Sequence, residues 1–313
     1  MSIRLIAIDI DGTLMPSSGL RISQRNCEAL LAAEAAGVKI IIATGRRQAY
    51  AMPLISQVGL QSTSVMVSSN GAVIRRFDGE LIARQFLPAP TARRLCAELG
   101  GYGTLVFTFD REGPGGLVSE NLERLQRLIQ RWVEANRPYL TEVTPIEQAF
   151  DGPELPIQGM VCGTVIEMKR AEGVLQARGF GDLMSMHRTE YAVRDLSILD
   201  LLPLGCSKGA AIHHLAQAWN LQQDEIMAIG DNLNDLEMLR YAGRPVVMAN
   251  ASEETVALAR ESGWEFTASN DEDGVARVIE SVLVQPAPVD GLESSGVREE
   301  APEGEDTMLE WVQ

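Results

Sequence analysis

The sequence predicts an α/β fold in which a Rossmann-like parallel-sheet core is interrupted by an inserted α+β cap domain. Short apolar runs end abruptly in polar clusters, and stretches of helical length lie between them. This rhythm stops near residue 84 and resumes near residue 188. Strands that alternate with helices in this way are typical of a doubly wound parallel sheet.

The first part of the core is predicted from three apolar runs and the helix between the first two. Ser23 is expected to cap that helix, and Gly37 to end it. Strands are expected over the apolar runs, which are residues 4–10, 38–43 and 65–67.

The sequence pattern changes in the middle of the chain, where long amphipathic stretches and short predicted strands are separated by loops rich in Gly and Pro. We expect helices over 91–99 and 121–136, and strands over 104–108 and 159–168. We interpret residues 85–187 as a cap domain inserted into a core of residues 1–84 and 188–284. Hinges are expected near residues 84–88 and 186–188.

The core rhythm then resumes. We expect a helix over 207–219, strands over 225–229 and 245–248, and a closing helix near 273–283. Residues 285–313 are rich in Pro, Gly, Ser and Glu, which predicts a disordered acidic tail.

Charge and length limit the classes of function. The 313 residues carry a net charge of -16. Residues 285–313 contain eight acids and one arginine, so the rest of the chain has a net charge of -9. This charge argues against nucleic acid as a partner. No run approaches the roughly 18 apolar residues of a membrane helix, and the apolar start is too short for a signal peptide. We therefore expect a cytoplasmic protein, with a monomer favoured and no membrane partner.

Polar clusters follow four of the apolar runs. Ligands bind beyond the carboxyl ends of strands in an open parallel sheet, so these clusters should meet at one edge, with Lys208 pointing toward them. Four carboxylates placed together require a cation. Oxygen ligands without His or Cys favour Mg²⁺ over Zn²⁺ and leave Mn²⁺ open. The clusters are Asp9 with Asp11, Thr44 with Arg46, Asn70, and Asp231 with Asn234 and Asp235.

These clusters resemble the motifs of the haloacid dehalogenase superfamily of phosphatases. Asp9-Ile-Asp11-Gly12-Thr13-Leu14 is similar to the first motif, Thr44-Gly45-Arg46 to the second, Lys208 to the third and residues 230–235 to the fourth. The large insert resembles the Cof-like subgroup, as do Ser69-Asn70-Gly71-Ala72, Asn250-Ala251 and Asn270-Asp271-Glu272-Asp273-Gly274. Residues 195–200 depart from the pattern, because many relatives have a Glu-containing strand there.

The resemblance implies a role for each carboxylate. Asp9 would be the nucleophile that takes the phosphoryl group and would also bind Mg²⁺. Asp11 would protonate the leaving alcohol, deprotonate the attacking water and bind the metal through its backbone carbonyl. Asp231 would be a direct metal ligand, and Asn234 and Asp235 would support the metal shell.

The remaining motif residues are assigned to the substrate. Thr44, Gly45 and Lys208 would hold the transferring phosphoryl oxygens. Arg46 and Asn70 are candidate substrate contacts.

The resemblance implies a magnesium-dependent phosphatase of small phosphorylated metabolites, such as sugar phosphates or phosphorylated cofactors. Two alternatives stay open. A phosphotransferase or phosphomutase would pass the same aspartyl-phosphate to a second hydroxyl. A phospho-ligand sensor would bind without turnover.

Overall fold

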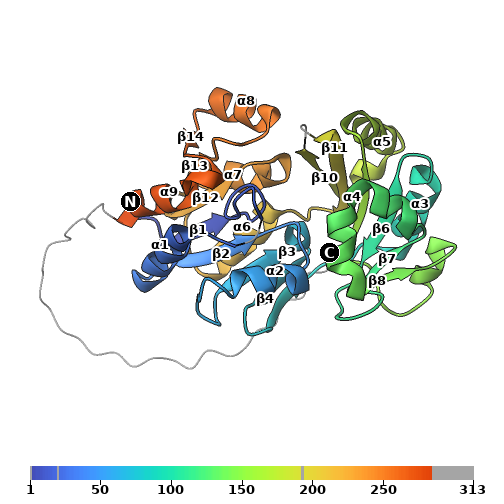
Figure 1. The fold of residues 1–313 in the computed structure, drawn as a ribbon, viewed down its shortest axis with the longest axis horizontal. Helices are drawn as coiled ribbons and strands as arrows, with labels where there is room; N and C mark the ends of the chain where they lie inside the picture. Colours follow the sequence, from blue (N-terminus) through green and yellow to red (C-terminus); the bar gives the residue numbers. More distant parts are fainter. Residues whose placement is uncertain (1, 20, 192–193, 284–313) are drawn as a thin grey trace, which may run out of the picture.

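The computed structural model describes residues 2–19, 21–191 and 194–283. Two lobes lie side by side, with the chain crossing between them (Figure 1). The predicted acidic tail, residues 285–313, lies outside the described residues. Within the described residues, no helix combines the length and apolar character needed to cross a membrane.

The first lobe is built on an eight-stranded sheet. Its strands from β14 to β3 run parallel, which confirms the predicted parallel core, whereas β4 and β5 extend it as an antiparallel hairpin that the sequence analysis did not predict. In spatial order the strands are β14 (Glu265–Phe266), β13 (Arg244–Val247), β12 (Ile226–Gly230), β1 (Leu5–Ile8), β2 (Lys39–Ala43), β3 (Val65–Ser68), β4 (Val73–Arg76) and β5 (Leu81–Arg84).

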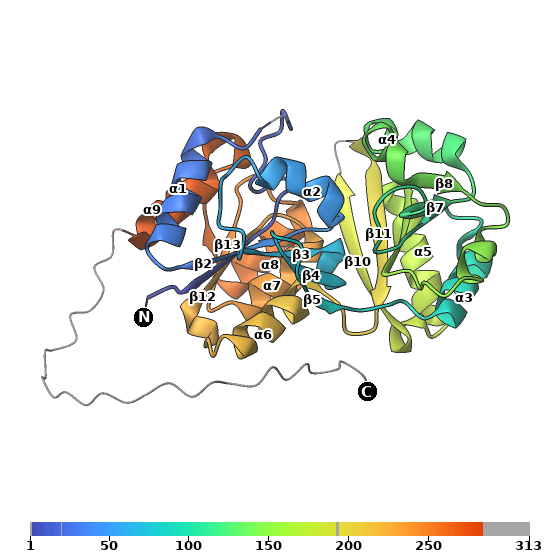
Figure 2. The same cartoon turned by 90° about the horizontal axis from the view of Figure 1, so that it is seen from below.

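Helices cover both faces of this sheet (Figure 2). Successive side chains of a strand point to opposite faces, so Ile6 and Ile8 join one apolar cluster and Leu5 and Ala7 the other. The first cluster contains residues of α1 (Gln24–Ala35), α2 (Gln48–Ile55) and α9 (Gly274–Leu283). The second contains residues of α6 (Lys208–Ala218), α7 (Leu236–Tyr241) and α8 (Glu253–Ser262).

The second lobe, the cap, has a six-stranded sheet with helices on both faces. Helices α3 (Ala89–Leu99) and α5 (Val165–Ala177) pack on one face, and α4 (Leu122–Asn136) packs on the other. In spatial order the strands are β10 (Met184–Tyr191), β11 (Leu196–Pro203), β9 (Gln158–Gly163), β6 (Thr104–Thr108), β7 (Leu117–Ser119) and β8 (Leu140–Glu142).

The structure moves the second boundary of the insert. Residues 188–203 were assigned to the core, but β10 and β11 pair with each other, and β11 pairs with β9 of the cap sheet. The hinge expected at residues 186–188 therefore lies inside a strand. Strand β11 ends at Pro203, and the turn at Leu204-Gly205 is the first turn after β11 and lies just before α6. We propose a cap of residues 85–203 between core segments 1–84 and 204–283.

Residues 159–168 were expected to form one strand, and this prediction is wrong for residues 164–168. Strand β9 ends at Gly163, and α5 begins at Val165. The Thr164 side chain accepts a hydrogen bond from the Glu167 backbone N–H, and Glu167 accepts from the Thr164 backbone N–H in return. This capping box starts a helix within a run that is otherwise apolar.

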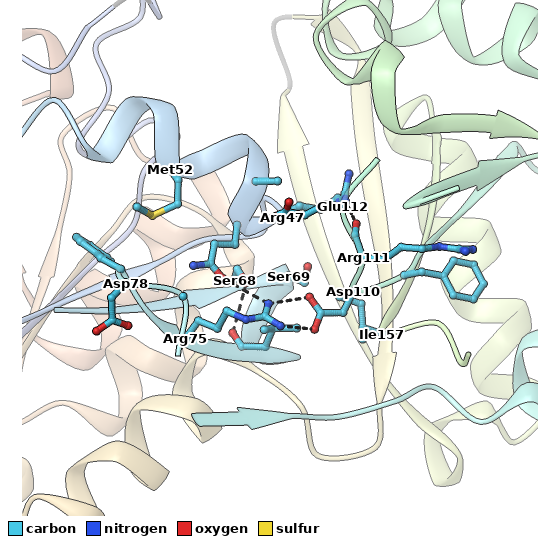
Figure 3. Close-up of a pocket in the computed structure, with 16 residues that line it drawn as sticks. Arg47, Met52, Ser68, Ser69, Arg75, Asp78, Asp110, Arg111, Glu112 and Ile157 are labelled. Carbon is cyan, nitrogen blue, oxygen red and sulfur yellow. Dashed lines mark hydrogen bonds and ion pairs between the residues drawn. The ribbon is translucent and has the colours of Figure 1, made fainter. Parts of the chain in front are cut away.

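An ion-pair clamp joins the two lobes on one side (Figure 3). Asp110, in the cap loop after β6, accepts two hydrogen bonds from Arg75 of β4 and one from Arg84 of β5, each at 2.8 Å. Burial raises the pKa of Asp110, but the two guanidinium groups outweigh burial and lower it. The clamp therefore favours the ionised carboxylate in the folded protein.

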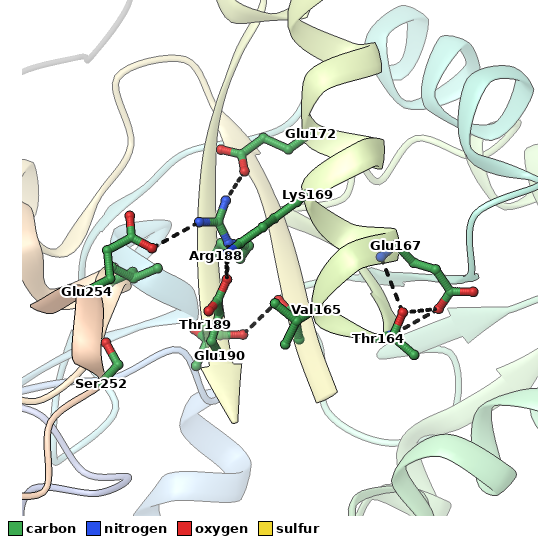
Figure 4. Close-up of polar contacts among 12 residues, drawn as sticks. Thr164, Val165, Glu167, Lys169, Glu172, Arg188, Thr189, Glu190, Ser252 and Glu254 are labelled. Atoms are coloured by element: carbon green, nitrogen blue, oxygen red, sulfur yellow. Dashed lines mark hydrogen bonds and ion pairs between the residues drawn. The ribbon is translucent and has the colours of Figure 1, made fainter. Parts of the chain in front are cut away.

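A second polar contact lies elsewhere along the seam (Figure 4). Arg188 of β10 donates to Glu190 at 2.7 Å, pairs with Glu172 of α5, and reaches Glu254 of α8 in the core at 3.4 Å. Asn232 of the core binds the backbone of Glu190 through both of its amide atoms. Both contacts attach the β10 edge of the cap to the core.

The clamp gives a first prediction. Asp110→Asn should lower the free energy of unfolding by about 1–3 kcal/mol, because two half-buried guanidinium groups lose their charged partner. Urea unfolding and hydrogen exchange along β4 and β5 measure this. Glu123→Gln is the matched control, since its pair with Arg127 is exposed and worth at most about 0.5 kcal/mol. Equal effects of the two substitutions would contradict the prediction.

Candidate active site

The fold gathers the predicted site residues at one edge of the core sheet. Asp9 follows β1, Thr44 follows β2, and Asp231 follows β12. Asn70 lies in the turn directly after β3. Because these strands are parallel, their carboxyl ends lie together, facing the cap.

Lys208 connects the two halves of the site. Its side chain is fully buried, and Nζ donates to Oδ1 of Asp9 and to Oδ1 of Asp235, each at 2.6 Å. It is the first residue of α6, and the Ser207 side chain caps that helix. Burial lowers the pKa of Lys208, but Asp235 and Asp9 outweigh burial and raise it. The ammonium group is therefore charged.

Three buried carboxylates form a candidate metal centre. Ligand atoms of Asp9, Asp231 and Asp235 all lie within 4.8 Å of one another. Burial and the neighbouring Asp235 raise the pKa of Asp9 to about 7, and burial and Asp9 raise that of Asp231. One lysine cannot neutralise three carboxylates, so the site retains excess negative charge. An all-oxygen, acidic donor set fits a hard divalent cation.

The carboxylates are held in place by local contacts. Oδ2 of Asp235 accepts the backbone N–H of Asp231 at 3.0 Å and of Asn232 at 3.1 Å, which fixes the turn after β12. Oδ1 of Asp231 accepts a 2.8 Å hydrogen bond from the Thr13 hydroxyl. Since both Asp235 oxygens are already engaged, Asp9 and Asp231 keep more free acceptor capacity for a cation.

Asp11 points away from this cluster. Its carboxylate forms a two-bond ion pair with Arg46, whose Nε donates at 2.7 Å. The Asp11 side chain is 41% exposed. The Thr44 hydroxyl accepts the backbone N–H of Arg46 at 3.1 Å, which ties the second motif to this pair. Gly45 fits because an added Cβ would lie 3.1 Å from the Asn70 side chain. Asp11 is thus placed at the cavity and outside the metal cluster.

A cavity of about 190 Å³ opens over these residues, with Asp9, Asp11 and Arg46 on its core side and cap residues opposite. A larger cavity of about 480 Å³ lies at the Asp110 clamp (Figure 3), but its lining includes none of the three clustered carboxylates. We therefore assign the chemistry to the smaller cavity.

Comparison with known proteins decides the family. The sequence profile of the haloacid dehalogenase-like hydrolases matches residues 6–279. The chain belongs to this family. The predicted resemblance is thus confirmed, and so is the predicted class of enzyme, a phosphatase.

Relatives of this hydrolase include phosphatases of similar length. The 5-amino-6-(5-phospho-D-ribitylamino)uracil phosphatase YwtE of Bacillus subtilis is 28% identical in an alignment that covers 90% of this chain and 98% of YwtE. The HMP-PP phosphatase of Escherichia coli O157:H7 is 27% identical over 255 residues, covering 79% and 85% of the two chains. Arabidopsis thaliana chloroplastic endoribonuclease YBEY is 29% identical over 88% of this chain, but this match spans only 45% of that protein.

Solved structures show the same fold. A haloacid dehalogenase-like hydrolase from Bacteroides thetaiotaomicron superposes with a TM-score of 0.72 at 27% identity, covering 90% of this chain and all of that one. The subclass IIB sugar phosphatase BT4131 gives 0.71 at 26% identity, covering 89% and 98%.

The sequence analysis missed one buried acid of this hydrolase. Asp200 of β11 is 6% exposed and lines the cavity. Its Oδ2 accepts a hydrogen bond from the Asn70 side-chain amide at 2.8 Å, and its Oδ1 accepts one from Gln158 at 2.5 Å. The side-chain Oδ1 of Asn70 in turn accepts from Asn234 at 3.1 Å. Asp200 ends the stretch 195–200 that departs from the relatives, but only the cap sheet pairing turns it toward the site.

Two asparagines beyond the four motifs hold the loop after β1. Asn250 donates to the Gly12 carbonyl at 2.7 Å, and Asn270 donates to the Met15 carbonyl at 2.8 Å. The backbone N–H of Asn270 donates to the Asn250 side chain at 2.9 Å, which links the two contacts. These residues position the first motif.

Gly12 gives the second prediction. It has φ +81°, and an added Cβ would lie 2.3 Å from Oδ2 of Asp231. Gly12→Ala should displace that carboxylate and reduce phosphatase kcat by about 100-fold, the effect of an ångström-scale misplacement. Gly37→Ala is the matched control, because its φ is +84° with nothing within 4 Å of the added atom. Steady-state kinetics of both variants measure this, and an equal loss in both would refute the steric explanation.

Asp200 gives the third prediction. Burial raises its pKa from 3.8 to about 6, so the folded state binds a proton more tightly than the unfolded state. Stability from this group is therefore present at low pH and lost as pH rises from about 4 to above 6. Asp200→Asn should raise the free energy of unfolding at pH 8 by on the order of 2 kcal/mol and change it little at pH 4. Urea unfolding at both pH values measures this; a gain of equal size at pH 4 would contradict it.

Proposed function

We propose that this phosphatase hydrolyses phosphate monoesters of small metabolites with Mg²⁺, through an aspartyl-phosphate on Asp9. The observation that carries the proposal is the buried Lys208 ammonium, which touches the Asp9 carboxylate at the end of β1, beside two further carboxylates. A nucleophile, a fixed cation and an acidic donor set meet around Asp9, which lines the small cavity.

The carboxylates of Asp9 and Asp231 would hold Mg²⁺, together with the backbone carbonyl of Asp11 that the family resemblance implies. Bound there, the ion supplies positive charge that neutralises the carboxylates and the phosphoryl oxygens. Asp235 would act indirectly, since its oxygens hold Lys208 and the turn that carries Asp231.

In the first step, an Asp9 oxygen forms a bond to phosphorus while the bond from phosphorus to the leaving oxygen breaks. Asp11 takes up a proton from solvent when it leaves Arg46, and gives this proton to the leaving oxygen, so the alcohol leaves neutral. Lys208 and the Thr44 hydroxyl donate to the phosphoryl oxygens, where negative charge gathers. The ion pair between Arg46 and Asp11 is exchanged for the contact of Asp11 with the leaving oxygen.

In the second step, Asp11 takes a proton from water, the water oxygen bonds to phosphorus, and the bond to Asp9 breaks. Phosphate leaves and Asp9 is restored. Acceleration on the order of 10²¹ is required for the slowest phosphate monoesters. General acid–base catalysis contributes only about 10²–10⁴ of it, so the nucleophile and the charges around it must contribute most of the rest.

The substrate class follows from the cap and from the relatives. The cap covers a cavity of about 190 Å³, which suits a small leaving group and excludes bulk water from it. The relatives YwtE and HMP-PP phosphatase are named for phosphorylated metabolites, and BT4131 for sugar phosphates. We therefore propose sugar phosphates or phosphorylated cofactors as substrates.

The fourth prediction tests this mechanism. Phosphate release from a panel of phosphorylated metabolites should require Mg²⁺, stop with chelator, and be abolished by Asp9→Asn. Asp11→Asn should lower it by about 10²–10⁴, the usual contribution of a general acid. Asp182→Asn, at an exposed cap position, should retain full activity.

Each failure of this test has a distinct meaning. Release that survives Asp9→Asn would remove Asp9 as the nucleophile. Phosphate transfer to an added alcohol, in preference to water, would favour the phosphotransferase alternative.

A further inference from the structure

The cap side of the catalytic cavity has an unusual distribution of charge. Much of its lining is apolar or aromatic, as at Trp132, Met160 and Ile198, with neutral amides at Asn136 and Gln158. Among the described residues that line this cavity, Asp200 is the one acid that the cap supplies, and the cap supplies no lysine or arginine. Whatever a substrate presents to the cap therefore meets neutral groups and one carboxylate.

The Asp200 carboxylate has acceptor capacity to spare. Its two hydrogen-bond partners, Asn70 and Gln158, are neutral amides. Each donates one hydrogen bond, Asn70 to Oδ2 and Gln158 to Oδ1 of Asp200. A carboxylate offers about four acceptor positions. N–H and O–H donors of a ligand can fill the rest, whereas a ligand carboxylate or second phosphate would meet a like charge in a buried site.

Two guanidinium groups line the same cavity from the core side. Arg46 forms its two-bond ion pair with Asp11. Arg47 donates through Nη2 to the Arg111 carbonyl at 2.8 Å and lies over the Tyr139 ring, while its buried Nη1 has no hydrogen-bond partner among the described residues. Arg47 therefore keeps one free donor on the core side, and the charge that a ligand meets on the cap side is that of Asp200.

We propose that Asp200 selects the leaving group: the substrate is a compact phosphate monoester whose leaving group carries a hydroxyl or amino donor, and no acidic group, at the position that faces Asp200. Asp200 accepts hydrogen bonds from that donor, and Asn70 and Gln158 hold the carboxylate in position. This inference rests on the phosphatase function proposed above and specifies the substrate class of that site.

The fifth prediction uses three matched phosphate esters. D-Glucitol 6-phosphate, 1-amino-1-deoxy-D-glucitol 6-phosphate and 6-phospho-D-gluconate share one chain and differ only at C1, which carries a hydroxyl, an amine or a carboxylate. Hydrolysis gives kcat/KM for each, and inhibition of p-nitrophenyl phosphate hydrolysis gives Ki where turnover is slow. The alcohol and the amine should be favoured over the carboxylate by about tenfold or more.

Asp200→Asn should reduce this preference to about threefold or less, since the variant keeps the shape and removes the charge. Asp182→Asn, an exposed cap position with the same change of charge, should keep the wild-type preference. Urea unfolding of both variants shows that each has folded, and hydrolysis of p-nitrophenyl phosphate, whose leaving group offers no donor, should continue in Asp182→Asn.

The outcomes separate the two proposals. If the wild-type protein does not hydrolyse p-nitrophenyl phosphate with Mg²⁺, the phosphatase mechanism fails. If it does, but does not discriminate within the series, or if Asp200→Asn leaves the discrimination unchanged, the role of Asp200 is overturned while the mechanism stands.

Discussion

The buried contact of Lys208 with Asp9 and Asp235 is the constraint on which the rest of the site depends. Three carboxylates cannot be packed within 4.8 Å of one another in a dry interior unless positive charge accompanies them. Lys208 supplies part of that charge from α6, on one face of the sheet, to residues that follow β1 and β12. The chain has 27 lysines and arginines, yet a compact ammonium group stands at this position, where a planar guanidinium would need a wider space.

The surrounding loops are shaped by the same crowding. Gly12 has no side chain because the Asp231 carboxylate occupies that space, and a Cβ on Gly230 would meet the Asp235 side chain at 2.6 Å. Backbone N–H groups of the turn after β12 donate to Asp235, and Asn250 binds the carbonyl of Gly12. Glycines and backbone donors thus let acidic groups approach one another more closely than bulkier neighbours would permit.

The core site is well predicted from the sequence, because neighbouring residues in the chain indicate where each strand ends. An apolar run followed by polar residues marks the end of a buried strand, and parallel strands bring such ends together. This is enough to place Asp9, Thr44, Asn70 and Asp231 at one edge. Ser23 likewise caps α1 as its position before the helix predicts.

The cap is harder to predict because its sheet depends on distant pairing. Strand β11 pairs with β9, about 40 residues earlier in the chain, and no local signal in residues 188–203 shows that they belong with the cap. Asp200 lies between Leu199 and Leu201, and nothing in this local sequence indicates a polar partner, whereas the fold turns it toward Asn70. The antiparallel strands β4 and β5 were not predicted for a related reason. A short hairpin has no helix between its strands, so the alternation of strands and helices does not indicate where it lies.

The composition of the seam bears on how the enzyme can work. Its contacts are mostly polar: the Asp110 clamp, the Arg188 pair, and the bond from Asn70 to Asp200. Among the described residues, a small apolar cluster that includes Val73, Ile157 and Leu202 also crosses it. Polar contacts can be exchanged for water at modest net cost, so such a seam can open to release product and close to exclude water. Because Asp200 meets the core through Asn70, the proposed leaving-group site is complete only while the cap contacts the core.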